Sequence, residues 1–384
     1  MNRVTIRKIN ELNVLREIFN QAPTSRATVA KTLDLTKSTV YSIFTKLEND
    51  DLIYDIGQGS STRSGGRKPA LTNFNARAGY TINTKINEDT ISCMTNWLDG
   101  SEIAYQEFPL TGRDASQRLL GLYQAIKLSM IDGQDLLGIS VAIYGIVRDN
   151  HVIRATAADL AEFDLVQVIQ SRFNVPVVLG NEANLAALAM RDFTTAPVKS
   201  AVALSLANGI GAGMIIDGEL YAGASSEAGE IGNARYYGLG HEEPVAVKDV
   251  GSDAAVLSQL AQVKGQAVVI ADIRRWYDAD DPEARVILKN FCVGIEIVLQ
   301  NLLLTFDPEK IVISSEILRA VPELLRTIKA RLAPLLDHEV PLELVANVDQ
   351  ATLLGGCALI SRQVLGLPTG ELIFKNRTVP PLEA

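Results

Sequence analysis

Apolar residues near the N-terminus recur at the spacing of amphipathic helices. They lie three or four positions apart through a first predicted helix that ends before Pro23: Ile6, Ile9, Leu12, Leu15, Ile18 and Phe19. A short second helix follows with Thr24 or Ser25 as its cap, and a third runs from Lys37 to about Asn49 with Thr36 as its N-cap. Two helices joined by the tight turn 33–35 are typical of a helix-turn-helix.

The first turn of the third predicted helix carries the candidate DNA contacts. In a helix-turn-helix this turn enters the major groove, and here it is polar and basic. The candidates on this side are Thr36, Lys37, Ser38, Thr39 and Tyr41, together with Arg26 from the second helix. An ordinary solvated helix face with a cap is the alternative interpretation.

Two alternating segments, 52–56 and 70–74, predict a β-hairpin with a long glycine-rich tip. The tip contains basic residues and no acidic ones, and its candidate DNA contacts are Arg63, Gly65, Gly66, Arg67 and Lys68. Glycines let the backbone approach DNA, and the basic groups can reach phosphates or the minor groove. Residues 1–76 therefore predict a winged helix-turn-helix, with a plain interdomain linker as the alternative for the tip.

The rest of the chain has an α/β pattern. Strand pairs at about 79–95 and 200–216 each open a segment that continues with further strands and helices. Two similar halves predict two lobes around a cleft, where ligands of such folds bind. We place lobe 1 at residues 77–195, completed by the C-terminal segment 350–384, and lobe 2 with dimer contacts at 196–349.

Composition narrows the class of protein. The 384 residues are 47% hydrophobic and 21% charged, which is typical of globular chains. No apolar run reaches the length of a membrane span and no secretory signal is evident. The three cysteines are scattered and odd in number, which argues against a disulfide framework and a cysteine zinc site. We expect a cytoplasmic protein without membrane contact.

Charge separates the N-terminal segment from the rest. Residues 1–76 hold 11 Lys and Arg against 7 Asp and Glu, a balance of +4, whereas the remaining 308 residues carry −13. An acidic body is repelled by nucleic acid and a basic segment is not. This asymmetry favours a DNA-binding module attached to a second activity.

Taken in order, five segments resemble the ROK family, which is named for repressors, open reading frames and sugar kinases. They are the N-terminal module with its Gly65–Pro69 sequence, then 178–188, 209–223, 227–232 and 306–313. The resemblance covers essentially the whole chain, and 56–59 and 181–184 look most like the xylose-repressor branch. It implies an actin-like, ribonuclease-H-like pair of lobes. It also implies two partners, a DNA operator and a sugar effector.

Departures from the family pattern argue against a kinase. Family kinases carry a D-x-G-G-T phosphate loop, but 82–86 here reads Ile-Asn-Thr-Lys-Ile. Glu182 stands where the family has its catalytic Asp, which moves the carboxylate by about one methylene. A Gly-Gly near the adenosine site is replaced by Ser314 and Ser315, and only the loop 209–213 keeps its glycines. We therefore expect no catalytic residues, no enzyme activity and no cofactor.

The family's zinc and sugar motifs are kept only in part. The E-x-G-H motif ends here in Asn233, and the cysteine motif that follows it in relatives is missing, so we expect no metal. The resemblance implies sugar contacts from Asn181, Glu182, Glu230 and Asn233, because amides and carboxylates can bridge vicinal hydroxyls. A further family Glu falls near Lys248 or Asp249 without a secure match. An emptied site with merely paired polar groups is the alternative.

These observations predict a sugar-responsive repressor of carbohydrate-utilisation genes, with xylose as the sugar suggested by analogy. Because one winged helix contacts one half-site, we expect a homodimer or higher homo-oligomer that binds a pseudo-palindromic operator. The apolar segment 284–305 is the expected dimer contact. Two alternatives stay open: an ATP-dependent sugar kinase of the family, and a repressor controlled by a protein partner.

Overall fold

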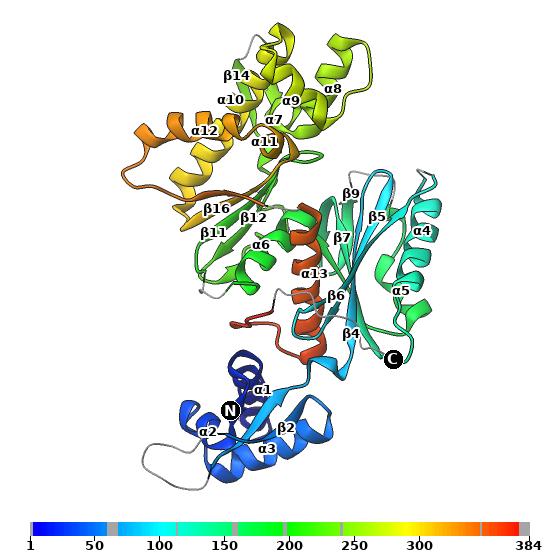
Figure 1. Ribbon diagram of the computed structural model, residues 1–384, viewed down its shortest axis with the longest axis vertical. Coiled ribbons are helices and arrows are strands. Elements are labelled where there is room, and N and C mark those ends of the chain that lie inside the picture. The colour runs from blue at the N-terminus through cyan, green and yellow to red at the C-terminus, as the bar shows by residue number, and fades with distance from the viewer. Residues whose placement is uncertain are drawn as a thin grey trace.

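The computed structural model describes residues 3–59, 68–112, 114–155, 160–194, 198–238, 241–345 and 348–375. Figure 1 shows an N-terminal unit at the bottom and two larger α/β lobes above it. The long helix α13 (Val348–Leu365) runs between the lobes and ends close to the N-terminal unit. Segments from the two ends of the chain therefore lie side by side.

The N-terminal unit (α1 to β3) packs three helices against a small sheet of strand order β1-β3-β2. Its elements are α1 (Arg3–Gln21), β1 (Thr24–Ser25), α2 (Arg26–Thr32), α3 (Lys37–Asn49), β2 (Ile53–Gln58) and β3 (Ala70–Phe74). The Thr36 side chain caps α3, as the sequence predicted, and of the two caps that the sequence allowed for α2, Thr24 and Ser25, the structure has Ser25. The inner face of α3 is buried through Val40, Ile43, Phe44 and Leu47.

The first helix differs from the expected amphipathic pattern. Ile6 and Ile9 are 42% and 39% exposed, although their spacing matches the apolar face. The buried positions are Val14, Leu15, Ile18 and Phe19, all in the second half of α1. Among the described side chains of α1, from Thr5 onwards, the ones fully buried in the core lie in this half, so helical periodicity alone does not say how far the core extends.

The first lobe contains a five-stranded sheet of order β10-β7-β4-β5-β6. Helices α4 and α5 cover one face and α13 covers the other. Its elements are η1 (Ala76–Ala78), β4 (Tyr80–Ile86), β5 (Thr90–Trp97), β6 (Glu102–Pro109), α4 (Ala115–Leu128), β7 (Leu136–Ile143), β8 (Gly145–Arg148), β9 (His151–Ala155), η2 (Leu160–Glu162), α5 (Leu165–Phe173), β10 (Val177–Asn181) and α6 (Glu182–Asp192).

The second lobe repeats this pattern with the order β13-β12-β11-β16-β17. In both sheets three antiparallel strands are extended by two parallel strands. Its elements are β11 (Ala201–Ser205), β12 (Gly211–Ile216), β13 (Glu219–Leu220), η3 (Ile231–Asn233), β14 (Arg235–Gly238), β15 (His241–Ala246), α7 (Lys248–Gly251), α8 (Asp253–Lys264), α9 (Ile270–Asp278), α10 (Pro282–Phe306), β16 (Lys310–Ser314), α11 (Glu316–Ala320), α12 (Pro322–Leu332), η4 (Ala333–Leu335) and β17 (Leu342–Leu344).

Helix α10 forms the centre of the second lobe. Its apolar side chains, including Phe291, Ile295 and Leu299, are buried against the sheet and the neighbouring helices. Among the described residues α10 is also the one helix long and apolar enough to cross a membrane, but more than half of that stretch is buried inside the lobe. Val286 and Leu304 remain exposed on its surface. Most of the apolar segment expected at a dimer interface is thus used inside the chain.

Helix α6 lies between the two lobes. It packs against α13 on one side and against β11 and β12 of the second sheet on the other. Val202 and Leu204 face the helices of the second lobe, while Ala203 between them faces α6. A Cβ atom at Gly355 of α13 would lie 1.7 Å from the backbone oxygen of Leu185, so this close helix contact requires glycine.

Candidate functional site

A cavity of about 630 Å³ lies in the cleft between the lobes, within the range of roughly 300–1,000 Å³ common for small-molecule sites. Both lobes contribute polar side chains to it. The first lobe supplies Tyr144, Arg154, Asn181 and Glu182, and the second supplies Glu230, Asn233, Lys248 and Asp249. All four residues predicted to bind sugar therefore line one cavity.

Strand order explains why the first-lobe residues meet. The parallel strands β7 and β10 end side by side, with Asn181 paired to Ile143. Tyr144 and Glu182 follow these strand ends directly, at the edge of the sheet that faces the cavity. In open α/β sheets the carboxyl ends of parallel strands are the usual place for a ligand.

Asn181 already has several partners within the protein. Its Oδ1 accepts hydrogen bonds from the backbone N–H groups of Ala183 and Asn184, which caps α6. Its Nδ2 donates to the backbone oxygen of Gly145 at 2.7 Å. One amide hydrogen remains for a ligand, so Asn181 positions the start of α6 as much as it lines the cavity.

Glu182 is the most perturbed acid of the cavity. Its Oε2 is buried, and no described group forms a hydrogen bond to it. Burial raises the pKa of Glu182 to about 7; Lys85 opposes this shift and Glu230 across the cleft adds to it. A carboxyl group that titrates near neutrality can donate or accept a hydrogen bond in the cavity.

We expect Glu182 to make the protein less stable as the pH rises. The pKa lies near 7 in the folded state and at an ordinary 4.5 when unfolded, so the protonated group stabilises the fold fully below pH 4.5 and this contribution is lost towards pH 7. Glu182→Gln should make the fall in unfolding free energy between pH 5 and 7 shallower by up to about 1 kcal/mol per pH unit. Urea denaturation at several pH values measures this slope.

The control for this test is Glu343→Gln, which changes an exposed glutamate on β17. The control should keep the wild-type slope. If Glu182→Gln also kept it, the buried carboxyl would not be protonated in the folded state near pH 6.

Glu230 reaches the cavity because its loop lies on β12. Gly229 has φ +91°, and a Cβ atom there would lie 1.7 Å from the backbone oxygen of Ala212. The Glu230 carboxylate then accepts hydrogen bonds from Arg154 at 3.0 Å and from Asn233 at 3.1 Å. Lys248 donates to Asn233 at 2.8 Å. The Arg154–Glu230 ion pair joins the two lobes directly across the cleft.

Sequence reasoning did not single out Arg154 or Tyr144. Arg154 lies in β9, an ordinary alternating strand without a motif, and its role depends on the other lobe. The sequence offered no secure match between Lys248 or Asp249 and the further family Glu. Both residues line the cavity at the start of α7. A contact between segments 76 residues apart leaves no local signal in the sequence.

The segments that replace kinase motifs are engaged in internal contacts. Lys85 is fully buried at the end of β4, where it pairs with Asp349 at 2.5 Å and lies over the Tyr144 ring. Burial alone would lower the pKa of Lys85, but Tyr144 and Asp349 raise it above its ordinary value.

In the second lobe Ser315 donates to Asp253 at 2.7 Å. Burial raises the pKa of Asp253 to about 7 despite that hydrogen bond.

The described residues contain no group of three or more His, Cys, Asp or Glu side chains that could hold a metal ion. Cys93, Cys292 and Cys357 are each buried and unpaired. The side chain of His241, the one histidine near the family's zinc motif, lies outside the described residues.

Most of the predicted DNA contacts at the start of α3 are exposed. Thr36, Lys37, Ser38 and Tyr41 are exposed, and Thr39 is half-buried. Arg26 is less free than expected, because it pairs with Glu48 at 2.7 Å and its guanidinium lies over the Tyr41 ring. Lys68 is exposed at the end of the described hairpin. Arg63, Gly65, Gly66 and Arg67 lie outside the described residues.

Comparisons with known proteins agree on one family. The ROK family model matches residues 88–363. The xylose repressor of Lactiplantibacillus pentosus is 33% identical over 381 residues, with 98% of each chain covered. The xylose repressor of Staphylococcus xylosus is 31% identical over 384 residues, which covers 95% of this chain and 98% of the relative.

Solved structures share the fold. A ROK family transcriptional regulator, a homologue of the Escherichia coli MLC protein, has a TM-score of 0.79 at 20% identity and covers 94% of this chain and 98% of its own. A ROK family glucokinase from Streptomyces griseus, solved with glucose and AMPPNP, has a TM-score of 0.60 at 19% identity. It covers 73% of this chain and 99% of its own.

Proposed function

Because this chain belongs to the ROK family, we propose that it is a transcriptional repressor that binds its operator through residues 1–76 and releases it when a sugar binds between the lobes. The relatives named as xylose repressors match it over nearly their whole length. We therefore propose a pentose such as D-xylose as the effector. A repressor acts where the DNA is, which places it in the cytoplasm.

The observation that carries this proposal is the exposed polar surface of α3 in the N-terminal unit. The helix pair α2–α3 has a buried apolar face and an exposed first turn with Lys37, and β2 and β3 form a hairpin beside it. We assign this arrangement as a winged helix-turn-helix, with α3 in the major groove and the hairpin beside the backbone. Arg26 would then hold Tyr41 in place rather than contact DNA freely.

The cavity supports a sugar as the effector. Its lining combines carboxylates, amides and cationic groups, which suit a ligand with many hydroxyl groups. The Arg154–Glu230 pair bridges the cleft without ligand, so a sugar that bonds to Glu230 and to Asn181 would replace a direct contact by a bridged one. A ligand shifts the lobes only through such differential contacts.

An active kinase is the weaker alternative, although glucokinases of the family share the fold. The segment 82–86 has no glycine for close phosphate approach, and its Lys85 is bound to Asp349. The observations favour a binding protein over a phosphoryl-transfer enzyme. Control by a protein partner would show as operator release without any sugar.

Recognition of two half-sites requires two copies of the chain, so we propose a homodimer. The second lobe is the expected contact, but the buried face of α10 does not supply it. The exposed Val286 and Leu304 of the same helix are the apolar positions left for it.

The test of the proposed function is operator selection from a pool of random duplexes, followed by binding measurements with and without D-xylose. We expect a pseudo-palindrome with half-sites about one helical turn, or a multiple of it, apart. Lys37→Ala should weaken binding and reduce the slope of log K against log salt by about one. Fluorescence anisotropy at several salt concentrations measures both.

The matched control is Lys329→Ala, an exposed lysine on α12 of the second lobe. It should leave affinity and salt slope unchanged. Failure to enrich any duplex sequence, or equal salt slopes in Lys37→Ala and wild type, would contradict the assignment of α3.

A further inference from the structure

We propose that the C-terminal strap, residues 366–375, passes lobe movement to the DNA-binding unit by linking α1 to both lobes. The strap follows α13 and lies against α1 in Figure 1. The inference rests on the proposed function, because it concerns how the sugar cavity controls DNA binding. The covalent linker 75–79 would otherwise be the obvious path between them.

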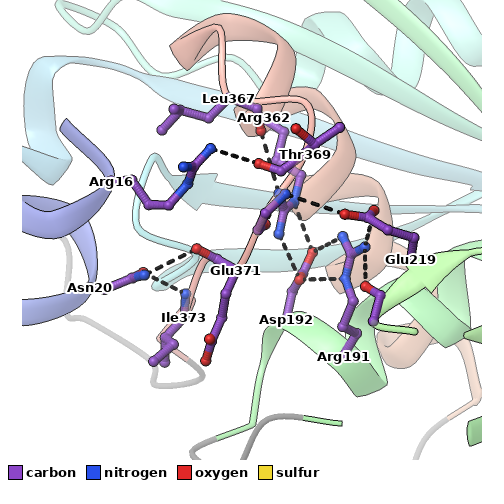
Figure 2. Close-up of polar contacts among 12 residues, drawn as sticks. Arg16, Asn20, Arg191, Asp192, Glu219, Arg362, Leu367, Thr369, Glu371 and Ile373 are labelled. Atoms are coloured by element: carbon purple, nitrogen blue, oxygen red, sulfur yellow. Dashed lines mark hydrogen bonds and ion pairs between the residues drawn. The ribbon is translucent and has the colours of Figure 1, made fainter. Parts of the chain in front are cut away.

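Two polar side chains of α1 hold the strap. Arg16 donates to the backbone oxygen of Thr369 at 2.8 Å. Asn20 donates to the backbone oxygen of Glu371 at 3.0 Å and accepts from the backbone N–H of Ile373 at 2.9 Å. Figure 2 shows both side chains pointing from α1 to the strap.

Apolar packing joins the same two segments. The Phe19 ring of α1 lies 5.1 Å from the Phe374 ring, and Phe374 stacks in turn on Phe193 at the end of α6. Leu367, Leu372 and Phe374 are part of the same buried cluster as Val14, Ile18 and other core residues of the N-terminal unit. The strap thus completes the core of that unit.

The strap is also fixed to the first lobe. Asp192, the last residue of α6, is buried between Arg362 of α13, at 2.8 Å, and Arg191, also at 2.8 Å. Arg362 donates to the backbone oxygen of Gly370 at 2.8 Å, and the backbone oxygen of Asp192 accepts from Phe374. The strap therefore moves with the C-terminal end of α6.

The second lobe reaches the strap through the β12–β13 turn. Glu219 accepts from the backbone N–H of Gly370 at 3.3 Å and pairs with Arg191 at 3.2 Å. Arg191 also donates to the backbone oxygen of Gly218. A rotation of the second lobe would displace Glu219 relative to α6, and with it the strap that holds Arg16 and Asn20.

Helix α6 connects this network to the cavity. Its N-cap Asn181 and first residue Glu182 line the cavity, and Asp192 is the last of its 11 residues, about 15 Å from Glu182 along the helix axis. A sugar at one end and the strap at the other thus contact the same rigid element. A packed helix of this kind transmits displacement as a unit.

The experiment compares Glu219→Gln, Asn20→Ala and the double variant with wild type. D-xylose binding is measured by calorimetry on free protein and on its complex with the selected operator. The ratio of the two dissociation constants is the coupling between the sites, and linkage makes it equal to the effect of xylose on operator binding. We expect each single variant to lower this ratio about two- to fivefold while the free protein binds xylose as wild type does.

The double variant tests whether the contacts act in one relay. In a single relay, weakening one end already limits what the path can pass on, so the double variant should lose less than the product of the two single losses. Glu343→Gln serves as the matched charge control and should keep the wild-type ratio. Circular dichroism and free-protein xylose affinity verify that the variants are folded.

Two results would overturn the proposal. One is a wild-type ratio in both single variants, which would assign the coupling to the linker 75–79. The other is a double variant whose loss equals the product of the single losses, which indicates two independent local effects. If wild-type protein bound no operator or no xylose, the proposed function would fail instead, and the relay with it.

Discussion

Glu230→Gln should yield a repressor that binds its operator normally but no longer responds to the sugar. Glu230 is a second-lobe carboxylate of the cavity, and a hydrogen bond from a sugar hydroxyl to a charged group contributes about 1.5–3 kcal/mol. Its loss corresponds to a roughly 10- to 150-fold weaker affinity for D-xylose. Calorimetry measures the sugar affinity, and anisotropy measures operator release over a xylose titration.

Glu230 is a sharper test than Asn181. An Asn181→Ala change also removes the α6 cap, at about 0.5–2 kcal/mol of stability, so a lost response would have two explanations. Glu230 caps no helix through its side chain, and its partner Arg154 is mostly exposed. Operator release by Glu230→Gln at the wild-type xylose concentration would place the effector outside this cleft.

Asp192→Ala should be the most destabilising substitution that we propose. Asp192 is 1% exposed, and its carboxylate neutralises two arginines, of which Arg362 is itself buried. Removing one partner of a buried ion pair leaves an uncompensated charge and costs about 3–5 kcal/mol. Urea unfolding followed by tryptophan fluorescence is informative here, because Trp97 lies in the first lobe and Trp276 in the second.

The expected pattern is lobe-specific. The transition reported by the first lobe should move further to lower urea than that of the second, since Arg362 belongs to α13, which packs on the first sheet, whereas α6 also packs on the second. Asp192→Asn keeps the shape and some hydrogen bonds and should lose less. If the urea midpoint of Asp192→Ala stayed within error of that of the wild type, water would have to reach Arg362 and compensate its charge.

The local signals in the sequence predicted local structure well. The cap at Thr36 and the apolar face of α3 appear as expected, because such features depend on neighbouring residues. The repeated β-hairpins predicted two lobes, and the family motifs placed Asn181, Glu182, Glu230 and Asn233 around one cavity. These motifs work because each lies on a short loop or helix start whose position the sheet order determines.

Contacts between distant segments could not be predicted in the same way. Arg154 meets Glu230 only because two lobes close on each other, and Arg16 meets Thr369 across 353 positions of sequence. The exposed Ile6 and Ile9 show the converse, an apolar spacing that the described part of the chain leaves uncovered. The spacing of apolar residues in the sequence shows which face of a helix or strand is apolar, but it does not show which other surface covers that face.

The shared core of the N-terminal unit and the strap has a consequence for synthesis of the protein. Val14, Ile18 and Phe19 leave the ribosome early, whereas Leu372 and Phe374, which cover them, are translated some 350 residues later. Such long-range closure is slow, and the uncovered apolar surface is exposed to non-native association meanwhile. A nascent chain therefore cannot complete the core of its N-terminal unit until both lobes have been made. For the same reason, a chimera that exchanges only residues 1–76 between relatives would inherit a mismatched core unless residues 366–375 are exchanged with them.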